Sequence, residues 1–152
     1  MKNFKTLLFP ILIFLISFTG FAQRVGGGWS ANNSYSRLFN TATMVELKGK
    51  ITSIDKIIPA KGMSNGIHLI LKTDKNVNYS VHLGPQWYFD NHSIKYSVGD
   101  YIVVKGSKIT YNNAPAIIAV SVKKGKTILT LRDKNGFPVW SGSRQGQSGG
   151  RN

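Results

Sequence analysis

Two histidines, His68 and His82, are the residues of this chain whose type and spacing could support metal binding. They lie in segment 66–88, where odd positions are apolar or aromatic and, Ile70 apart, even positions are mostly polar. Such alternation predicts the two strands of a β-hairpin. If Leu71 pairs with Tyr79 across the hairpin, the same register places His68 opposite His82. Directly opposed side chains have Cβ atoms about 4.5–5.5 Å apart, a separation from which two imidazoles can share one divalent ion.

The turn of this hairpin follows from the register. Pairing Leu71 with Tyr79 leaves Asp74, Lys75 and Asn76 as a three-residue loop, and Asn tolerates the left-handed conformation that such loops require. The polar face of the hairpin is therefore predicted to be half-exposed and available to a ligand.

We identify that polar face, with two lysines at its margins, as the candidate ligand-binding surface. Two histidines alone are too few ligands for tight metal binding, so the metal site is the narrower hypothesis and structural histidines are the alternative. Neither His92 nor Asp90 is placed near the pair by any periodicity. The predicted ligand-binding residues are His68, Lys72, Asn78, Ser80 and His82, with Lys61 and Lys75 at the margins, and the predicted metal ligands are His68 and His82.

A short helix is predicted directly after the hairpin. Gly84-Pro85 ends the strand, and proline suits the first turn of a helix, here residues 86–92. One or two of its three aromatic residues are predicted to close one end of the hydrophobic core, and the remaining one is left open as a stacking surface for a base or a sugar. These core helix aromatics are Trp87, Tyr88 and Phe89.

The remaining elements are predicted to be strands. Further strands are expected over 45–57, 101–110 and 114–123, with a bend or bulge at Gly49 and an additional C-terminal hairpin over 127–132 and 137–140. Five strands with one short helix between strands three and four is the element order of a five-stranded OB-like Greek-key barrel, an all-β fold. A β-sandwich and an SH3-like barrel are the alternatives.

The ends of the chain differ in composition from the barrel region. Lys2 and Lys5 precede an apolar run that ends near Ala22, which predicts a cleaved signal peptide over 1–22 and export to the periplasm or the exterior. No transmembrane span is expected after cleavage. Segments 23–34 and 141–152 are rich in glycine and polar residues and are predicted to be disordered, which leaves 35–140 as the barrel domain.

The charge of the chain indicates an anionic partner. The formal net charge is +14, and losing two lysines with the signal peptide leaves 14 − 2 = +12. Such a surface attracts nucleic acid, anionic polysaccharide or phosphate head groups, although scattered solvated lysines are the plainer interpretation. A polyanion and a periplasmic protein are both plausible partners. The basic residues expected on the surface of strands and loops include Arg132.

Catalysis is not indicated by any motif. Asp74, Asp100 and Asp133 lie where turns favour aspartate, which leaves few carboxylates for acid–base chemistry, and no serine lies in a nucleophile-elbow pattern. The chain has no cysteine, which excludes disulfides, thiolate metal sites and covalently attached haem. We therefore predict a protein that is not an enzyme and has no cofactor, with a weakly held divalent metal as the one open alternative.

Several segments between Tyr35 and Gly142 resemble a family of small exported bacterial proteins with the domain found in the magnetosome proteins MamS and MamX. The resembling segments are YSRLFNTAT, GIHLILKT, VHLGPQWY, VGDYIVVKGSKI, PAIIAVSVKKG and LTLRDKNGFPVWSG. The resemblance implies an OB-like binding or accessory module of unassigned ligand, with DNA binding attributed to some relatives. MamX-type relatives carry a haem-attachment CxxCH motif, which this chain lacks, so haem is not implied here.

Overall fold

The computed structural model describes residues 28–142, so the predicted signal peptide and most of the predicted C-terminal tail lie outside the described residues. The strands are β1 (Met44–Ile57), β2 (Gly66–Thr73), β3 (Asn78–Pro85), β4 (Tyr101–Tyr111), β5 (Ala114–Lys124) and β6 (Thr127–Thr130). Short helical turns are η1 (Ser36–Leu38), η2 (Thr41–Thr43), α1 (Gln86–Asp90) and α2 (Val139–Gly142). Within residues 28–142 none of the helices has the length and hydrophobicity that crossing a membrane requires.

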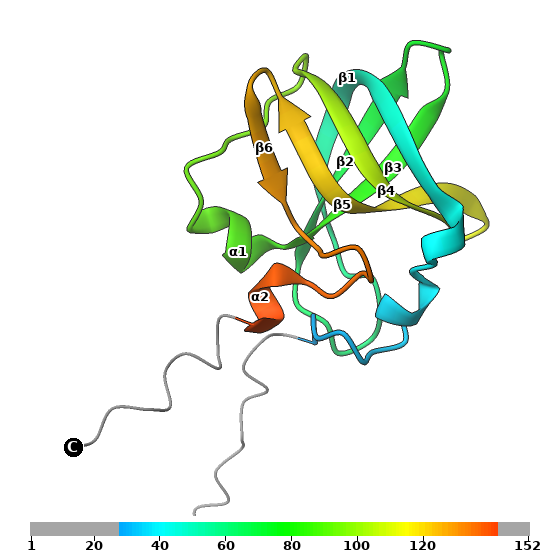
Figure 1. Cartoon of the computed structure of the whole chain (residues 1–152), viewed down its shortest axis with the longest axis vertical. Helices are drawn as coiled ribbons and strands as arrows, with labels where there is room; N and C mark the ends of the chain where they lie inside the picture. The colour runs from blue at the N-terminus through cyan, green and yellow to red at the C-terminus, as the bar shows by residue number, and fades with distance from the viewer. Residues whose placement is uncertain (1–27, 143–152) are drawn as a thin grey trace, which may run out of the picture.

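Strands β1 to β5 close into a barrel. The sheet order is β3-β2-β1-β4-β5-β6, and a parallel pairing of β3 with β5 joins the two ends of the five-stranded part. β6 pairs only with β5 and lies outside the barrel, as Figure 1 shows. The predicted all-β, OB-like barrel with α1 between strands three and four is confirmed, and the sandwich and SH3-like alternatives are excluded.

The barrel interior is filled by alternate residues of each strand. In the hairpin, Leu69, Leu71, Val81 and Leu83 are completely buried, and each is an odd-numbered position of the predicted apolar face. The other barrel strands contribute branched residues in the same way, so that aliphatic side chains from all five strands meet along the barrel axis. These residues include Ile51, Ile102, Val104, Ile109, Ile117 and Val122.

The hairpin has the register that its alternation predicts. Leu71 pairs with Tyr79, and His68 pairs with His82. The loop is Asp74–Asn76, closed by a hydrogen bond from the Thr73 backbone N–H to the Val77 carbonyl and by one from the Val77 N–H to the Thr73 hydroxyl, and Asn76 has a φ of 65°. The local sequence therefore determines this element down to single residues.

Gly49 is needed for close approach, and the bulge predicted near it lies further along the strand. The register of β1 against β2 shifts between Ile51 and Ser53, which places the bulge around Thr52. A Cβ atom at Gly49 would lie 2.1 Å from the carbonyl oxygen of Lys72, so the two backbones can only pack this closely with glycine there.

The chain on either side of the barrel strands forms a second packed layer. The predicted disordered leader over 23–34 is wrong for residues 28–34, because Trp29 is only 3% exposed and its indole Nε1–H donates to the Ser64 carbonyl. The indole of Trp140 donates to the Trp29 carbonyl, so the two segments lie together at the lower end of the barrel in Figure 1. An aromatic side chain in a polar segment can order that segment when a complementary surface is available.

The predicted C-terminal hairpin is shorter than expected. Its first arm is β6, which pairs with β5, and its return is a single bridge between Arg132 and Pro138. Helix α2 then takes the place of the second arm, which brings Trp140 under the barrel.

Candidate functional site

The predicted ligand surface, the polar face of the β2–β3 hairpin, is covered by the chain itself around His82. This side chain is completely buried. The Tyr35 hydroxyl lies 2.9 Å from His82 Nδ1, and the Ser80 hydroxyl lies 3.1 Å from His82 Nε2. Both ring nitrogens are therefore engaged whichever tautomer is present. The expectation of a half-exposed histidine at this position is wrong, because a segment far upstream packs on it.

The two imidazoles meet, but they stack. The ring centroids of His68 and His82 are 5.9 Å apart and the ring planes differ by 13°. Nitrogen lone pairs lie in the ring plane, so nearly parallel rings do not direct them at one shared ion. Among residues 28–142, no cluster of three or more His, Asp or Glu side chains is arranged to hold a metal ion. Metal binding by this pair stays a prediction that requires His82 to release Tyr35 or Ser80.

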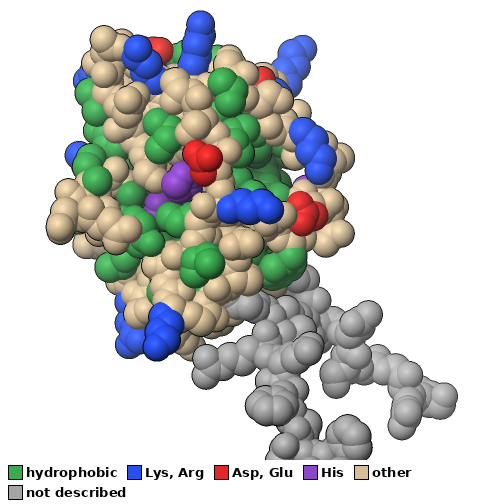
Figure 2. Space-filling model, turned by 180° about the vertical axis from the view of Figure 1, so that it is seen from behind, with side chains coloured by type: hydrophobic (Ala, Val, Ile, Leu, Met, Phe, Trp, Pro, Cys, Tyr) green, Lys and Arg blue, Asp and Glu red, His purple; other side chains and the backbone are tan. Residues whose placement is uncertain are grey.

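His68 is the more accessible member of the pair. Its side chain is 19% exposed, and its Nε2 lies 3.8 Å from a carboxylate oxygen of Asp55, its neighbour in β1. Its Nδ1 is buried and finds no hydrogen-bond partner in the part of the chain that the structure describes. Figure 2, which views the molecule from behind, shows a histidine beside an acidic side chain near the centre of this face. The hairpin face thus offers one partly open imidazole rather than a chelating pair.

Burial has a clear electrostatic consequence for His82. Loss of solvation is the main cause that lowers the pKa of His82 to about 4, with smaller contributions in the same direction from the nearby His68 and Arg132. Burial likewise raises the pKa of the Tyr35 hydroxyl. At neutral pH the pair is a neutral imidazole bonded to a neutral phenol, which fits a packing role.

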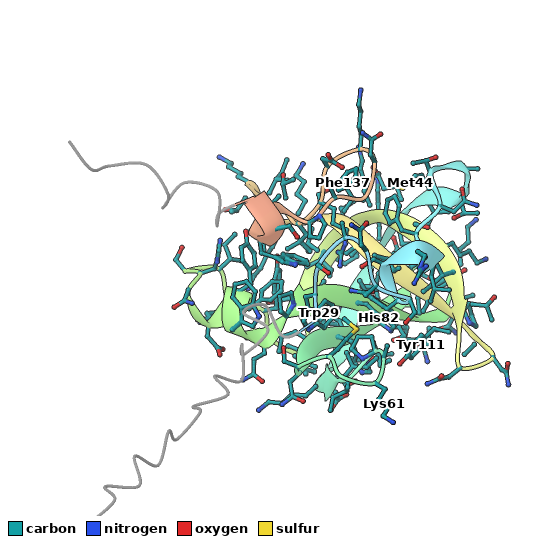
Figure 3. The ribbon with its side chains drawn as sticks, turned by 90° about the horizontal axis from the view of Figure 1, so that it is seen from below. Trp29, Met44, Lys61, His82, Tyr111 and Phe137 are labelled. Atoms are coloured by element: carbon teal, nitrogen blue, oxygen red, sulfur yellow. The ribbon has the colours of Figure 1, made fainter. Side chains whose placement is uncertain are left out.

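A cage of aromatic rings completes the cover over His82. The Tyr35 ring stacks on the His82 imidazole with 5.8 Å between the ring centroids, and the Tyr111 ring meets the imidazole edge-on with 4.8 Å between centroids. The rings of Trp29 and Tyr35 are also neighbours, with 5.7 Å between their centroids. In Figure 3, which views the molecule from below, Trp29, His82 and Tyr111 lie near one another. The face where an OB-like barrel would receive a ligand is filled here by the protein's own side chains.

The other predicted ligand residues do not converge on this cage. Lys72, Lys75 and Asn78 are exposed at the far end of the hairpin, near its loop. Lys61 is exposed in the β1–β2 loop and points outward in Figure 3. Ser80 is partly buried and bonds to His82. The structure therefore divides the predicted site into a buried histidine cluster and separate surface lysines.

Arg132 is not part of the exposed basic set to which the sequence assigned it. It is 5% exposed, and its Nη1 donates to the carbonyls of Leu83 and Ala119. The guanidinium also lies 4.9 Å from the ring centroid of Trp140. Burial lowers the pKa of Arg132 to about 10, so the group stays charged at neutral pH. The Arg132 side chain thereby links β3 to β5, because it donates hydrogen bonds to a backbone carbonyl of each strand just beyond their parallel pairing.

The helix aromatics divide between core and surface. Phe89 is buried, while Trp87 and Tyr88 are partly buried and pack against the hydrophobic core. Helix α1 ends at Asp90, two residues before the predicted end, and His92 Nδ1 bonds to the Tyr88 carbonyl at 2.7 Å. His92 therefore bonds to the end of the helix and is not part of the cluster formed by His68 and His82.

The aspartates occupy the turn positions that the sequence favours. Asp133 accepts hydrogen bonds from the backbone N–H groups of Asn135 and Phe137, and Asp100 accepts one from Ser97. The hydrogen bond from Lys124 lowers the pKa of Asp100 most strongly. These carboxylates shape loops and form no pair suited to acid–base catalysis.

The residues that the sequence reading missed are those that cover the hairpin. Trp29 stands alone among glycine, serine and asparagine, and that isolation was the available signal. A second signal was two glycines at opposite strands of the hairpin, Gly66 and Gly84, where a Cβ would lie 2.3 Å from Trp29 and 2.6 Å from Trp140. Glycine inside a strand marks close approach by another group.

Comparison with known proteins places the barrel in a family. No curated protein matches the chain. The model of the MamS/MamX magnetosome protein family matches residues 43–129, which is more than half of the chain and runs from just before β1 into β6. With its OB-like barrel and this match over all six strands, the chain belongs to the MamS/MamX magnetosome protein family.

Proposed function

We propose that the protein is an exported, non-enzymatic accessory module that binds an anionic partner through its outer surface. The observation that carries this proposal is the charge distribution. Within residues 28–142 every lysine side chain is exposed except Lys124, which is partly exposed, while acidic residues number only six in the whole chain. A basic surface of this kind attracts polyanions.

The polar face of the β2–β3 hairpin is the weaker candidate for the surface that binds the anionic partner. His82, its central residue, is completely buried under Tyr35. A ligand would have to displace this segment to reach it. The lysines need no such rearrangement, since they already project into solvent.

Membership of a magnetosome protein family supports an accessory role, and the barrel offers a scaffold for binding rather than a reaction centre. The carboxylates of Asp100 and Asp133 serve turns, and the histidines serve packing. Binding of an anionic partner, in contrast, depends on the excess positive charge of the chain.

The test is a binding titration at several salt concentrations. The chain from Gln23 onward is mixed with inorganic polyphosphate, a single-stranded oligonucleotide and vesicles containing phosphatidylglycerol. We expect at least one to bind at low salt, with affinity falling as salt rises. Failure of all three to bind at low ionic strength would refute the proposal.

Export is tested separately by the N-terminus of the protein in its host. Mass spectrometry of the periplasmic and secreted fractions should find a chain that begins at Gln23. Recovery of the protein only in the cytoplasm, with residues 1–22 intact, would contradict export without bearing on anion binding.

A further inference from the structure

The outer face of the sheet formed by β1, β4, β5 and β6 combines lysines with exposed apolar side chains. Register and burial place its residues: Lys48 pairs with Val103, which pairs with Lys123, which pairs with Ile128. A neighbouring row contains Lys50 and Tyr101. We name this surface the lysine face, and its outward residues are Lys48, Lys50, Tyr101, Val103, Lys105, Lys123 and Ile128.

Alternation along each strand explains why these side chains gather outside. Gly49, Ile102, Val104 and Val122 point to the core and are buried, so their neighbours in sequence must point outward. Strands lie about 4.8 Å apart, and residues i and i+2 are about 7 Å apart along a strand. Four lysines therefore stand on one surface only a few strands wide.

The charge of the lysine face, with its four lysines, is positive even after the carboxylates of Glu46 and of Asp74, which borders Tyr101, are counted. Glu46 lies 3.9 Å from the Lys48 ammonium and 3.5 Å from that of Lys105. Lys50 and Lys123 form no ion pair within residues 28–142. A surface hollow of about 280 Å³ is lined by Lys48, Lys105, Lys123 and Ile128, together with Glu46, Val103 and Ser121. The hollow thus has cationic groups around it and an aliphatic side chain at its edge.

Exposed apolar groups distinguish this face from a merely solvated one. Ile128 is 60% exposed and Tyr101 is 47% exposed, and both lie among the lysines rather than on a separate patch. The Tyr101 hydroxyl donates to Asp74 at 2.6 Å, which holds its ring in place on the surface. Aliphatic and tyrosine side chains interspersed with lysines are the composition of proteins that lie on an anionic membrane surface.

We infer that the lysine face docks on the anionic head groups of a lipid bilayer, with Ile128 and Tyr101 entering the interface between head groups and acyl chains. The inference rests on the proposed anionic partner and specifies which surface and which partner. The face contains no arginine, the residue suited to bidentate phosphate recognition. It carries one aromatic ring, whereas single-strand nucleic-acid binders stack successive bases on several.

The experiment measures partition of the chain from Gln23 onward onto vesicles of phosphatidylcholine with and without phosphatidylglycerol. We expect binding only to the anionic vesicles. The double variant Lys48→Gln/Lys123→Gln should lower the partition coefficient about 30-fold, since each basic residue near such a surface contributes about a fivefold factor. A second variant, Ile128→Ser, should weaken binding at unchanged charge.

The matched control is Lys61→Gln/Lys134→Gln, which removes the same charge from two exposed loop positions. Its partition coefficient should fall by less than about fivefold, since only long-range attraction is lost. Circular dichroism of all variants checks that the barrel is folded. Equal losses in the two double variants, or no binding to anionic vesicles, would overturn the inference. Tight binding of oligonucleotide or polyphosphate without vesicle binding would also overturn it, while leaving the proposed function intact.

Discussion

The Tyr35 hydroxyl and the His82 imidazole are joined by a 2.9 Å hydrogen bond in a fully buried setting, although 47 residues separate them in sequence. Tyr35 precedes the first barrel strand, and His82 lies on β3 facing away from the barrel interior. This contact makes the upstream segment part of the folded domain. It also explains why a face that is open to ligands in other OB-like barrels is closed here.

Removing the Tyr35 hydroxyl should destabilise the domain. In Tyr35→Phe the ring still stacks on His82, but Nδ1 is left buried without a partner. We expect the free energy of unfolding to fall by about 1–2 kcal/mol, the usual cost of one unsatisfied buried polar group. Urea denaturation followed by tryptophan fluorescence measures it.

Tyr101→Phe is the matched control for that experiment. It removes a hydroxyl that bonds to Asp74 from a ring that is half exposed, where water can replace the lost partner. Its effect should stay within about 0.5 kcal/mol. A loss in Tyr35→Phe no larger than this would show that the bond to His82 contributes little to stability.

The depressed pKa of His82 predicts acid sensitivity. Burial holds the folded-state pKa at about 4, against 6.5 for an unperturbed imidazole, so the unfolded chain binds an extra proton between these values. Stability from this group is therefore complete above pH 6.5 and declines as the pH falls toward 4. The decline amounts to up to about 3 kcal/mol, and denaturation midpoints at several pH values measure it.

His82→Gln should flatten this dependence, because glutamine does not titrate. His68→Gln is the companion variant, and its profile should still decline on acidification but by a smaller amount, since losing His68 brings the folded-state pKa of His82 closer to its unfolded value. Comparing the slopes of the curves separates the contribution of the imidazole from that of the carboxylates. Parallel curves for wild type and His82→Gln would contradict the assignment.

The sequence was sufficient to predict elements whose determinants are local. The register of His68 with His82 and the left-handed Asn76 follow from alternation and loop length within about twenty residues. The cover over the hairpin could not be predicted in this way. Trp29 is 111 residues from Trp140, and nothing in either segment specifies that they meet. Arg132 is buried by the same layer of segments around Trp29 and Trp140, so the sequence alone did not distinguish its charge from a surface charge.

Arg132 should be important for stability although this buried cation forms no ion pair with any residue between 28 and 142. In Arg132→Met the carbonyls of Leu83 and Ala119 lose their donor, although the desolvation cost of the charge is relieved at the same time. We expect a net loss of roughly 2 kcal/mol. Arg37→Met, at an exposed position, is the control and should change the free energy of unfolding by under about 0.5 kcal/mol. Equal effects of the two substitutions would rule out the structural role of the buried guanidinium.

Close packing of Trp140 on Gly84 predicts a specific coupling between the two positions. A Cβ at Gly84 would lie 2.6 Å from the Trp140 ring, and the three nearest heavy atoms all belong to that ring. Gly84→Ala alone should therefore cost about 1–3 kcal/mol through overpacking. In a Trp140→Phe background the smaller ring leaves room for the methyl group, so the same substitution should cost much less. Trp29→Phe is the matched background, since its ring is not among those atoms, and there the full cost of Gly84→Ala should persist. A double-mutant cycle from urea denaturation measures both couplings, and equal values in the two backgrounds would show that Trp140 is not what requires glycine at this position.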